Sequence, residues 1–184
     1  MYIFLIPLLM GFSLHSVSSF TGAFSRRWGE RYGRWISGML RIGLAMPLWV
    51  IGIAMALRQP SPLFFVPGLA GDALGWLVVA AGAIVITLAL ALLRVRAAAP
   101  STRDALECSG VYSYLRHPIY AGMLLELTGL ALLWPSLAAL IVWVLGAVWI
   151  IVQTRLEELD LVQRFPAYRS YMDKVPAFIP HRRG

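Results

Sequence analysis

Charged residues are scarce in this sequence, and their scarcity excludes an ordinary soluble domain. Of its 184 residues, 14% are charged and 59% are hydrophobic, whereas soluble domains carry about 25% charged residues. Several apolar runs reach the roughly 20 residues that a transmembrane helix needs. The composition therefore predicts an all-α integral membrane protein whose surroundings are the lipid bilayer.

Cysteine and lysine are nearly absent as well. Cys108 is the single cysteine, which excludes an internal disulfide. We expect it in an intracellular loop as a spare thiol, and the sequence predicts no metal site. Lysine occurs once against 15 arginines. This ratio, with abundant Ala, Leu and Gly, is typical of a GC-rich bacterial genome and favours the bacterial inner membrane as the location.

The positive charge is spread along the chain rather than gathered in one patch. The net charge is +7, but the basic residues lie between the apolar runs. We therefore interpret them as topology signals and predict no nucleic-acid partner. Residues 25–34, residues 94–116 and the tail from residue 155 are basic, whereas the other loops hold only Arg58. The positive-inside rule then predicts an external N-terminus and a cytoplasmic C-terminus.

The apolar runs predict about five transmembrane helices in a single membrane domain, an odd number that fits this orientation. The first run has neither the basic start nor the cleavage pattern of a signal peptide, so we interpret it as a span. Three spans are expected in residues 1–93 and two in residues 94–184. Their expected ranges are 1–24, 35–57, 73–93, 117–134 and 136–154.

The last two spans are predicted to form a helical hairpin. Trp134, Pro135 and Ser136 leave room for only a very tight turn between them. The hairpin occupies residues 117–154 and leads into a cytosolic tail, residues 155–184. That tail ends in an apolar, proline-stiffened segment from Val175 to Pro180, so we expect it to fold back as an amphipathic cover.

The start of the fourth span carries a concentration of polar groups. Pro118 suits the first turn of a helix because it has no N–H to lose. Arg116 and His117 then lie where the free N–H groups and the positive end of the helix dipole point. Such a site suits an anionic group such as a carboxylate. The alternative is that both residues only anchor the helix at the lipid headgroups.

A second polar group follows the fifth span. The helix is expected to continue through Glu157 and Glu158 until Pro166 stops it, and Tyr168 and Tyr171 then share one face of a short helical turn. Two ionisable residues inside spans are left over, His15 and Glu126. His15 either bonds to neighbouring helices or lines a site. Glu126 either pairs with Arg41 or makes a structural hydrogen bond, or it belongs to a substrate pocket.

At this point the residues resemble a known family. Two blocks carry the likeness, Gly110-x-Tyr112-x-x-x-Arg116-His117-Pro118-x-Tyr120-x-Gly122 and Glu157-Glu158-x-x-Leu161-x-x-x-Phe165-x-x-Tyr168-x-x-Tyr171-x-x-x-Val175-Pro176-x-x-Ile179-Pro180. They resemble the isoprenylcysteine carboxyl methyltransferase family and the related membrane phospholipid methyltransferases. The likeness covers roughly the last 80 residues.

The resemblance implies a membrane-embedded methyltransferase that uses S-adenosyl-L-methionine and releases S-adenosyl-L-homocysteine. The cofactor would lie at the cytosolic face, enclosed by the hairpin and the tail. The implied cofactor-binding residues are Tyr112, Arg116, His117, Pro118, Tyr120, Gly122, Glu157, Glu158, Tyr168, Tyr171, Val175, Pro176 and Phe178. The predicted catalytic residues are Glu158, Glu126 and Arg155.

The methyl acceptor is expected to be lipophilic and to enter from the bilayer. Family members from eukaryotes usually have an aromatic residue where Glu126 stands, so a small lipophilic thiol, a carboxylate or a lipid amine fits at least as well as a prenylated protein. An amine or thiol would need a base, for which Glu158, Glu126 and His117 are candidates. The sequence makes no prediction of oligomeric state.

Two alternative functions remain open at this level. Membrane reductases of the sterol type look similar in the C-terminal region and use NADPH, although a 2′-phosphate would call for a larger basic cluster. A non-catalytic membrane protein would bind no cofactor. It would leave the Arg-His-Pro triplet, the glutamate pair and the apolar tail without a purpose.

Overall fold

The computed structural model describes residues 2–66, 68–101 and 104–180. These residues are helical or irregular, with one isolated β-bridge between Leu63 and Ser136. The prediction of an all-α membrane protein is confirmed at this level. Residue 1 of the first expected span, Arg103 of the second basic loop and residues 181–184 of the expected tail lie outside the described residues.

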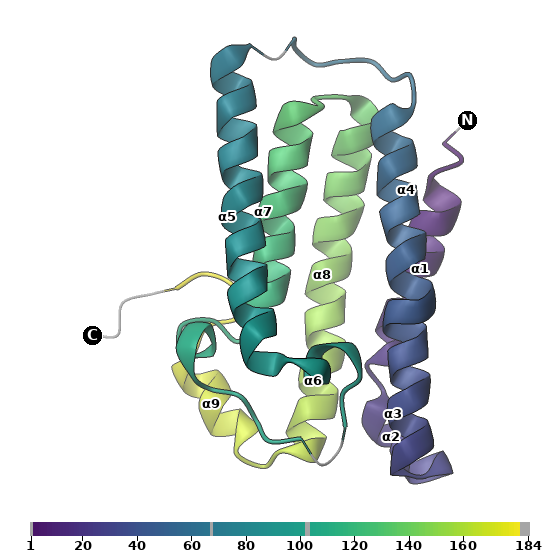
Figure 1. Ribbon diagram of the computed structural model, residues 1–184, viewed down its shortest axis with the longest axis vertical. Helices are drawn as coiled ribbons and strands as arrows, with labels where there is room; N and C mark the ends of the chain where they lie inside the picture. The colour runs from purple at the N-terminus through teal and green to yellow at the C-terminus, as the bar shows by residue number, and fades with distance from the viewer. Residues whose placement is uncertain (1, 67, 102–103, 181–184) are drawn as a thin grey trace.

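Long helices form a bundle whose axes are roughly aligned (Figure 1). They are α1 (Leu5–Ser18), α4 (Met46–Arg58), α5 (Leu69–Leu93), α7 (Pro118–Leu133) and α8 (Leu137–Arg164). The shorter helices α2 (Thr21–Trp28), α3 (Glu30–Gly38), α6 (Val95–Ala98) and α9 (Tyr168–Lys174) gather at one end. We call this the polar end; α7 begins there and α8 ends there.

Within the described residues, three helices are long and apolar enough to cross a membrane: Glu30–Arg58, α5 and α8. The bent pair α1 and α2 raises this number to four if it counts as one span. The remaining predicted span corresponds to α7, an apolar helix of 16 residues. The exact number of spans therefore stays a prediction.

The expected first span is not one continuous helix, and this prediction was wrong. The chain turns by 60° between α1 and α2. Hydroxyls at the break compete with the helical backbone: Ser18 Oγ donates to the carbonyl of His15 at 2.5 Å, and Thr21 Oγ1 lies 2.9 Å from Ser37 Oγ. The bend sends α2 across the polar end.

The basic loop predicted at residues 25–34 was also wrong, because those residues are mostly helical. Gly29 alone separates α2 from α3, with a φ of 84° that favours glycine. Beyond α3 the helix widens into a π-helical segment, Met39–Ala45, before it continues as α4. Arg41 lies in this segment. Short π-helical segments inside α-helices frequently occur at functional sites.

Helices α5 and α7 pack closely through glycines. A Cβ on Gly82 would lie 2.6 Å from the carbonyl oxygen of Gly122, and one on Gly129 would lie 2.7 Å from that of Gly75. Small residues let two helix backbones approach in a membrane. This contact fixes where α7 starts relative to α5, and so fixes one wall of the polar end.

Helices α7 and α8 form a hairpin joined by Trp134, Pro135 and Ser136. The Ser136 hydroxyl accepts from the amide of Ala139 and caps α8. Because the connection is short, the start of α7 lies beside the later part of α8, which continues beyond it at the polar end (Figure 1).

The segment after α9 runs back across the start of α7. The amide of Arg116 donates to Pro176 O at 2.9 Å, and that of His117 donates to Ala177 O at 3.2 Å. The Arg116 guanidinium also donates to Val175 O at 2.5 Å. These bonds satisfy backbone groups that a helix start would otherwise leave unpaired.

Candidate active site

A cavity of about 670 Å³ opens at the polar end. This volume lies within the range of small-molecule sites. Residues of α1, α2, α4, α5, α6, α7, α8 and α9 line it, together with the π-helical segment and the connection between α6 and α7. Its wall is mostly apolar, with polar groups concentrated on α7, on α8 and around Arg41.

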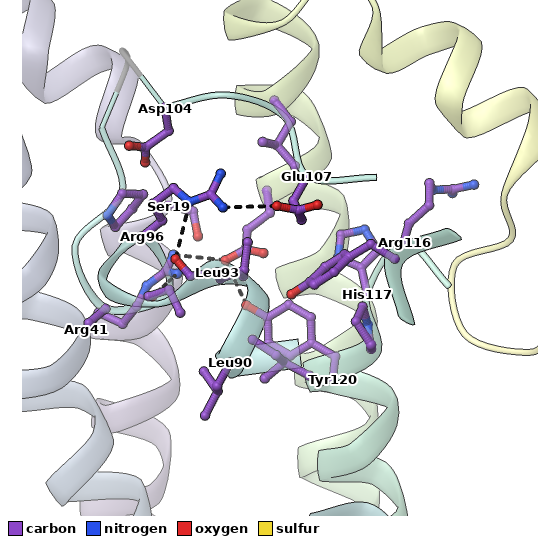
Figure 2. Close-up of a pocket in the computed structure, with 18 of the residues that line it drawn as sticks. Ser19, Arg41, Leu90, Leu93, Arg96, Asp104, Glu107, Arg116, His117 and Tyr120 are labelled. Atoms are coloured by element: carbon purple, nitrogen blue, oxygen red, sulfur yellow. Dashed lines mark hydrogen bonds and ion pairs between the residues drawn. The ribbon is translucent and has the colours of Figure 1, made fainter. Parts of the chain in front are cut away.

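Glu157 is the centre of the first polar cluster in this cavity. Its Oε1 accepts from Arg41 Nη2 at 2.9 Å, from the Tyr120 hydroxyl at 2.8 Å and from Gln153 Nε2 at 3.3 Å. Arg41 and Tyr120, both labelled in Figure 2, thus bind the same carboxylate oxygen. Its Oε2 has no hydrogen-bond partner in the described part of the chain, so one carboxylate oxygen remains available to a ligand.

Glu158 is the centre of a second cluster, and both of its carboxylate oxygens already accept hydrogen bonds from other residues. Its Oε1 accepts from Arg116 Nη2 at 2.8 Å and Nε at 3.1 Å, and it lies 3.2 Å from His117 Nε2. Its Oε2 accepts from Arg155 Nη1 at 3.2 Å. Glu158 is 4% exposed and does not line the cavity. It joins the end of α8 to the start of α7.

Tyrosines of the connection and of α9 form another part of the wall. Tyr171 donates to the carbonyl of Tyr112 at 2.5 Å, whereas the buried hydroxyl of Tyr168 has no partner among the described residues. Burial raises the pKa of all three hydroxyls. They therefore remain protonated hydrogen-bond donors at neutral pH.

An ion pair closes the side of the cavity that faces the α6–α7 connection. Arg96 Nη2 lies 3.0 Å from Glu107 Oε2, as Figure 2 shows, and Arg96 Nη1 donates to the carbonyl of Ala105 at 2.9 Å. The hydroxyl of Ser109, with help from Arg96, lowers the pKa of Glu107. The pair holds the connection against the end of α5.

The structure separates the predicted site residues into two groups. Those that line the cavity are Tyr112, Arg116, His117, Pro118, Tyr120, Glu126, Glu157, Tyr168 and Tyr171. Those that do not line it are Gly122, Arg155, Glu158, Val175, Pro176 and Phe178.

Several of these residues have structural contacts in place of the expected ligand contacts. Gly122 packs against Gly82, and Phe178 lies against the His117 ring with centroids 6.2 Å apart. The Arg155 side chain is 73% exposed and pairs with Glu158. Arg116 reaches the cavity, but Glu158 and tail carbonyls use its guanidinium, so it is not a free anion-binding group.

Sequence reasoning left Arg41, Arg96, Glu107 and Asp160 out of the site, although all four line the cavity. The suggested pairing of Arg41 with Glu126 was wrong, because Arg41 pairs with Glu157. The sequence did contain one signal for Arg41, because a charged residue inside a predicted span is a candidate for a functional site. Asp160 accepts from the amide of Gly22 at 3.1 Å and so links α8 to α2. No local sequence pattern predicts such a contact between residues far apart in the chain.

Comparisons with known proteins agree with this architecture. Residues 70–167 match the family described as phospholipid methyltransferase. Because this match covers more than half of the chain, the protein belongs to the phospholipid methyltransferase family. The matched part includes α5, α7, α8 and the connection that lines the cavity.

The chain is also similar to a named bacterial protein over part of its length. It is 37% identical over 78 residues to the cobalt-zinc-cadmium resistance protein CzcN of Cupriavidus metallidurans. The alignment covers 42% of this chain and 36% of that protein, so the chain spans little more than a third of that relative. No solved structure matches. Among the described residues, no group of three or more His, Cys, Asp or Glu could hold a metal ion.

Proposed function

We propose that the protein transfers a methyl group from S-adenosyl-L-methionine to a lipophilic acceptor that partitions into the membrane. One observation carries the proposal. The start of α7, Glu157 of α8 and the tyrosines of α9 meet in a single cavity, and the buried hydroxyl of Tyr168 lacks a partner among the described residues. Membership of the family supports the same reaction.

The groups in the cavity fit the chemistry of this cofactor. Its ammonium and ribose hydroxyls need acceptors, and Glu157 Oε2 is an available carboxylate oxygen. Its adenine needs flat apolar contacts and donors, which Tyr112, Tyr168 and Tyr171 supply. Its carboxylate needs a cation, and Arg94 lines the same space. The donor set therefore accommodates the cofactor without help from Arg116.

The bound cofactor supplies an electrophilic methyl group and is released as S-adenosyl-L-homocysteine. The residues of this chain mainly position the reacting groups and keep water away from them. Glu158 and Arg116 hold the hairpin and the tail together, and Pro176 and Ala177 cover the start of α7. Arg41 and Tyr120 fix the Glu157 carboxylate in one orientation. Water is excluded by the apolar wall.

The polar end is proposed to face the cytoplasm, where the cofactor is found. Arg94, Arg96, Arg116, Arg155 and Arg164 all lie near this end, as the positive-inside rule requires. The acceptor would enter from the bilayer. The family description and the mostly apolar wall of the cavity support a lipophilic acceptor.

The cofactor assignment predicts the effect of two conservative substitutions on binding. Tyr168→Phe and Glu157→Gln should each weaken binding of S-adenosyl-L-homocysteine about tenfold, because each removes one hydrogen bond or charge contact worth about 1.4 kcal/mol. Isothermal titration calorimetry of the detergent-purified protein measures this. Tyr168→Phe keeps the ring and removes only an unpartnered hydroxyl, so it leaves the fold intact.

Arg155→Met is the matched control, since Arg155 lies outside the cavity and should leave the dissociation constant unchanged. No binding by the wild-type protein would contradict the proposal. Binding of NADPH in place of S-adenosyl-L-homocysteine would favour the reductase alternative. Equal affinity in the wild-type protein and both variants would remove Tyr168 and Glu157 from the site.

A further inference from the structure

His15 is a buried imidazole that the fold itself does not use. It is 9% exposed, lies on α1 and lines the large cavity. Neither ring nitrogen has a hydrogen-bond partner among the described residues, and Nδ1 is fully buried. Its ring approaches Trp149 edge-on, with centroids 5.2 Å apart. Residues 70–167 alone match the family, so α1 lies outside the matched part.

An unpaired imidazole at this depth is costly. A neutral imidazole has one donor and one acceptor, and burial without partners forfeits both hydrogen bonds to water. A leucine or phenylalanine would fill the space beside Trp149 without that cost. An ionisable residue kept inside a membrane protein is by default a functional candidate. The position therefore indicates that His15 contacts a ligand.

Trp49 on α4 supplies a second unused donor in the same cavity. Its indole Nε1 is buried and has no partner among the described residues. An indole N–H can only donate, so it needs an acceptor atom. His15 and Trp49 come from two different N-terminal helices. The presence of two unpaired polar groups at one cavity is therefore not explained by the composition of a single helix face.

Trp49 also lines a second, smaller cavity of about 280 Å³. This cavity is apolar apart from Glu126, and it shares Trp49, Met123 and Glu126 with the large one. Its other lining residues are Phe12, Val50, Ile53, Ala54, Leu57, Leu127, Leu130 and Trp149. It extends along α7 away from the polar end, since Leu130 lies ten residues, or about 15 Å of helix, beyond Tyr120.

The two cavities together are suited to one elongated ligand. An apolar chain would lie in the small cavity, and a polar head group would lie beside Trp49 and His15. The head group would then project toward the part of the large cavity that contains Tyr120 and Glu157. This arrangement brings a lipophilic acceptor and a cytoplasmic cofactor together from opposite ends.

The hydrogen-bond donors and charged groups that line the two cavities restrict which kinds of head group can bind there. An ammonium has donors only, so it would leave the Trp49 N–H unpaired. A carboxylate has acceptors only and would face Glu126, which has no ion pair or hydrogen bond in the described part of the chain. Arg41 cannot compensate, because Glu157 neutralises it. A hydroxyl group is both donor and acceptor and carries no charge.

We infer that the acceptor is an uncharged, hydroxyl-bearing lipophile, such as an alkylphenol, and that His15 and Trp49 bind its oxygen. This inference rests on the proposed methyltransferase function. The O–CH₃ bond forms as the S–CH₃ bond of the cofactor breaks, and the hydroxyl proton passes to the unprotonated nitrogen of His15. Trp49 N–H holds the oxygen in place. His15 is thereby a catalytic residue and Trp49 a binding residue.

The test measures transfer of a tritiated methyl group from S-adenosyl-L-methionine to 4-octylphenol, to decanoate and to decylamine in detergent micelles. We expect transfer to 4-octylphenol alone. His15→Gln keeps a hydrogen-bonding side chain but is not a base, so it should lower kcat about a hundredfold or more. Trp49→Phe removes the N–H together with part of the indole ring, and it should raise KM for 4-octylphenol about tenfold with kcat unchanged.

The matched control is Trp143→Phe, which removes an indole N–H that bonds to Thr128 outside both cavities. It should change neither constant. Calorimetry with S-adenosyl-L-homocysteine distinguishes a failure of the proposed methyltransferase function from a failure of this inference alone. Failure of the wild-type protein to bind it would overturn the proposed function and this inference together.

Normal cofactor binding with no transfer to 4-octylphenol, or with transfer to decanoate or decylamine, would overturn this inference and leave the proposed function standing. Transfer to 4-octylphenol that is unaffected by His15→Gln and Trp49→Phe would likewise overturn it.

Discussion

Arg116 and Arg155 bind the same carboxylate, that of Glu158, in very different surroundings. The Arg116 side chain is 10% exposed and makes two of its contacts to Glu158 and two to tail carbonyls. The Arg155 side chain is 73% exposed. Removing one partner of a buried ion pair leaves an uncompensated charge, whereas an exposed pair contributes little because water replaces it.

We therefore predict that Arg116→Met lowers the free energy of unfolding by about 3 kcal/mol, whereas Arg155→Met lowers it by less than about 0.5 kcal/mol. Equilibrium unfolding in mixed micelles of mild detergent and SDS measures both. Comparable losses in the two variants would show that burial does not decide how much each arginine contributes to stability.

Individual residues also show what the sequence alone could supply. Pro118 at a helix start and Glu157 and Glu158 just beyond a span were visible in the sequence. Which glutamate faces the cavity was not, because adjacent residues on a helix point about 100° apart and only the packing of α8 decides between them. The Arg41–Glu157 pair joins segments far apart in the chain, so no local pattern could reveal it.

At the scale of helices, the close approach of α5 and α7 determines the shape of the cavity wall. Gly82 and Gly122 are in mutual backbone contact. A methyl group on Gly82 would also lie 2.9 Å from Glu126 Cγ. The backbone contact cannot be relieved by rotating a side chain, so the helices themselves must move apart.

Gly82→Ala should therefore destabilise the protein by about 1–3 kcal/mol despite the better helix propensity of alanine. Gly71→Ala on the same helix is the control, because nothing lies within 4 Å of its added Cβ. It should be neutral or slightly stabilising. Thermal unfolding of the two variants in detergent compares them, and a more stable Gly82→Ala protein would refute the contact.

Element boundaries were predictable where composition changes sharply and not where polar side chains interrupt an apolar run. The ends of α5 and α8 follow from hydropathy and from Pro166. The bend after Ser18 does not, because Ser18, Ser19, Phe20 and Thr21 would also fit a continuous helix in a membrane. The bend depends on the bond between Thr21 and Ser37, which only the packed structure reveals.

For the protein in its membrane, the central prediction is that the polar end faces the cytoplasm. The single native cysteine allows a direct test, since Cys108 is exposed at this end. A membrane-impermeant maleimide should leave Cys108 unlabelled in intact bacterial cells that express the protein, and it should label Cys108 in inverted vesicles. Burial and the Glu107 carboxylate raise the pKa of this thiol, so labelling is done at alkaline pH.

The control places the probe at the opposite end. In a Cys108→Ser background, Phe64→Cys puts a thiol in the exposed connection between α4 and α5, and it should be labelled in intact cells. The reverse pattern of labelling would invert the proposed orientation and remove the proposed cofactor site from the compartment that supplies the cofactor.

The backbone bonds from Arg116 and His117 to Pro176 and Ala177 have a consequence for biosynthesis. The start of α7 gains these partners only after the ribosome has synthesised the chain as far as Ala177. Until then the inserted hairpin holds Arg116 without its tail carbonyls. A premature stop codon upstream of Met172 would thus leave Arg116 and His117 without these partners, and we expect the truncated protein to lose the proposed methyl transfer.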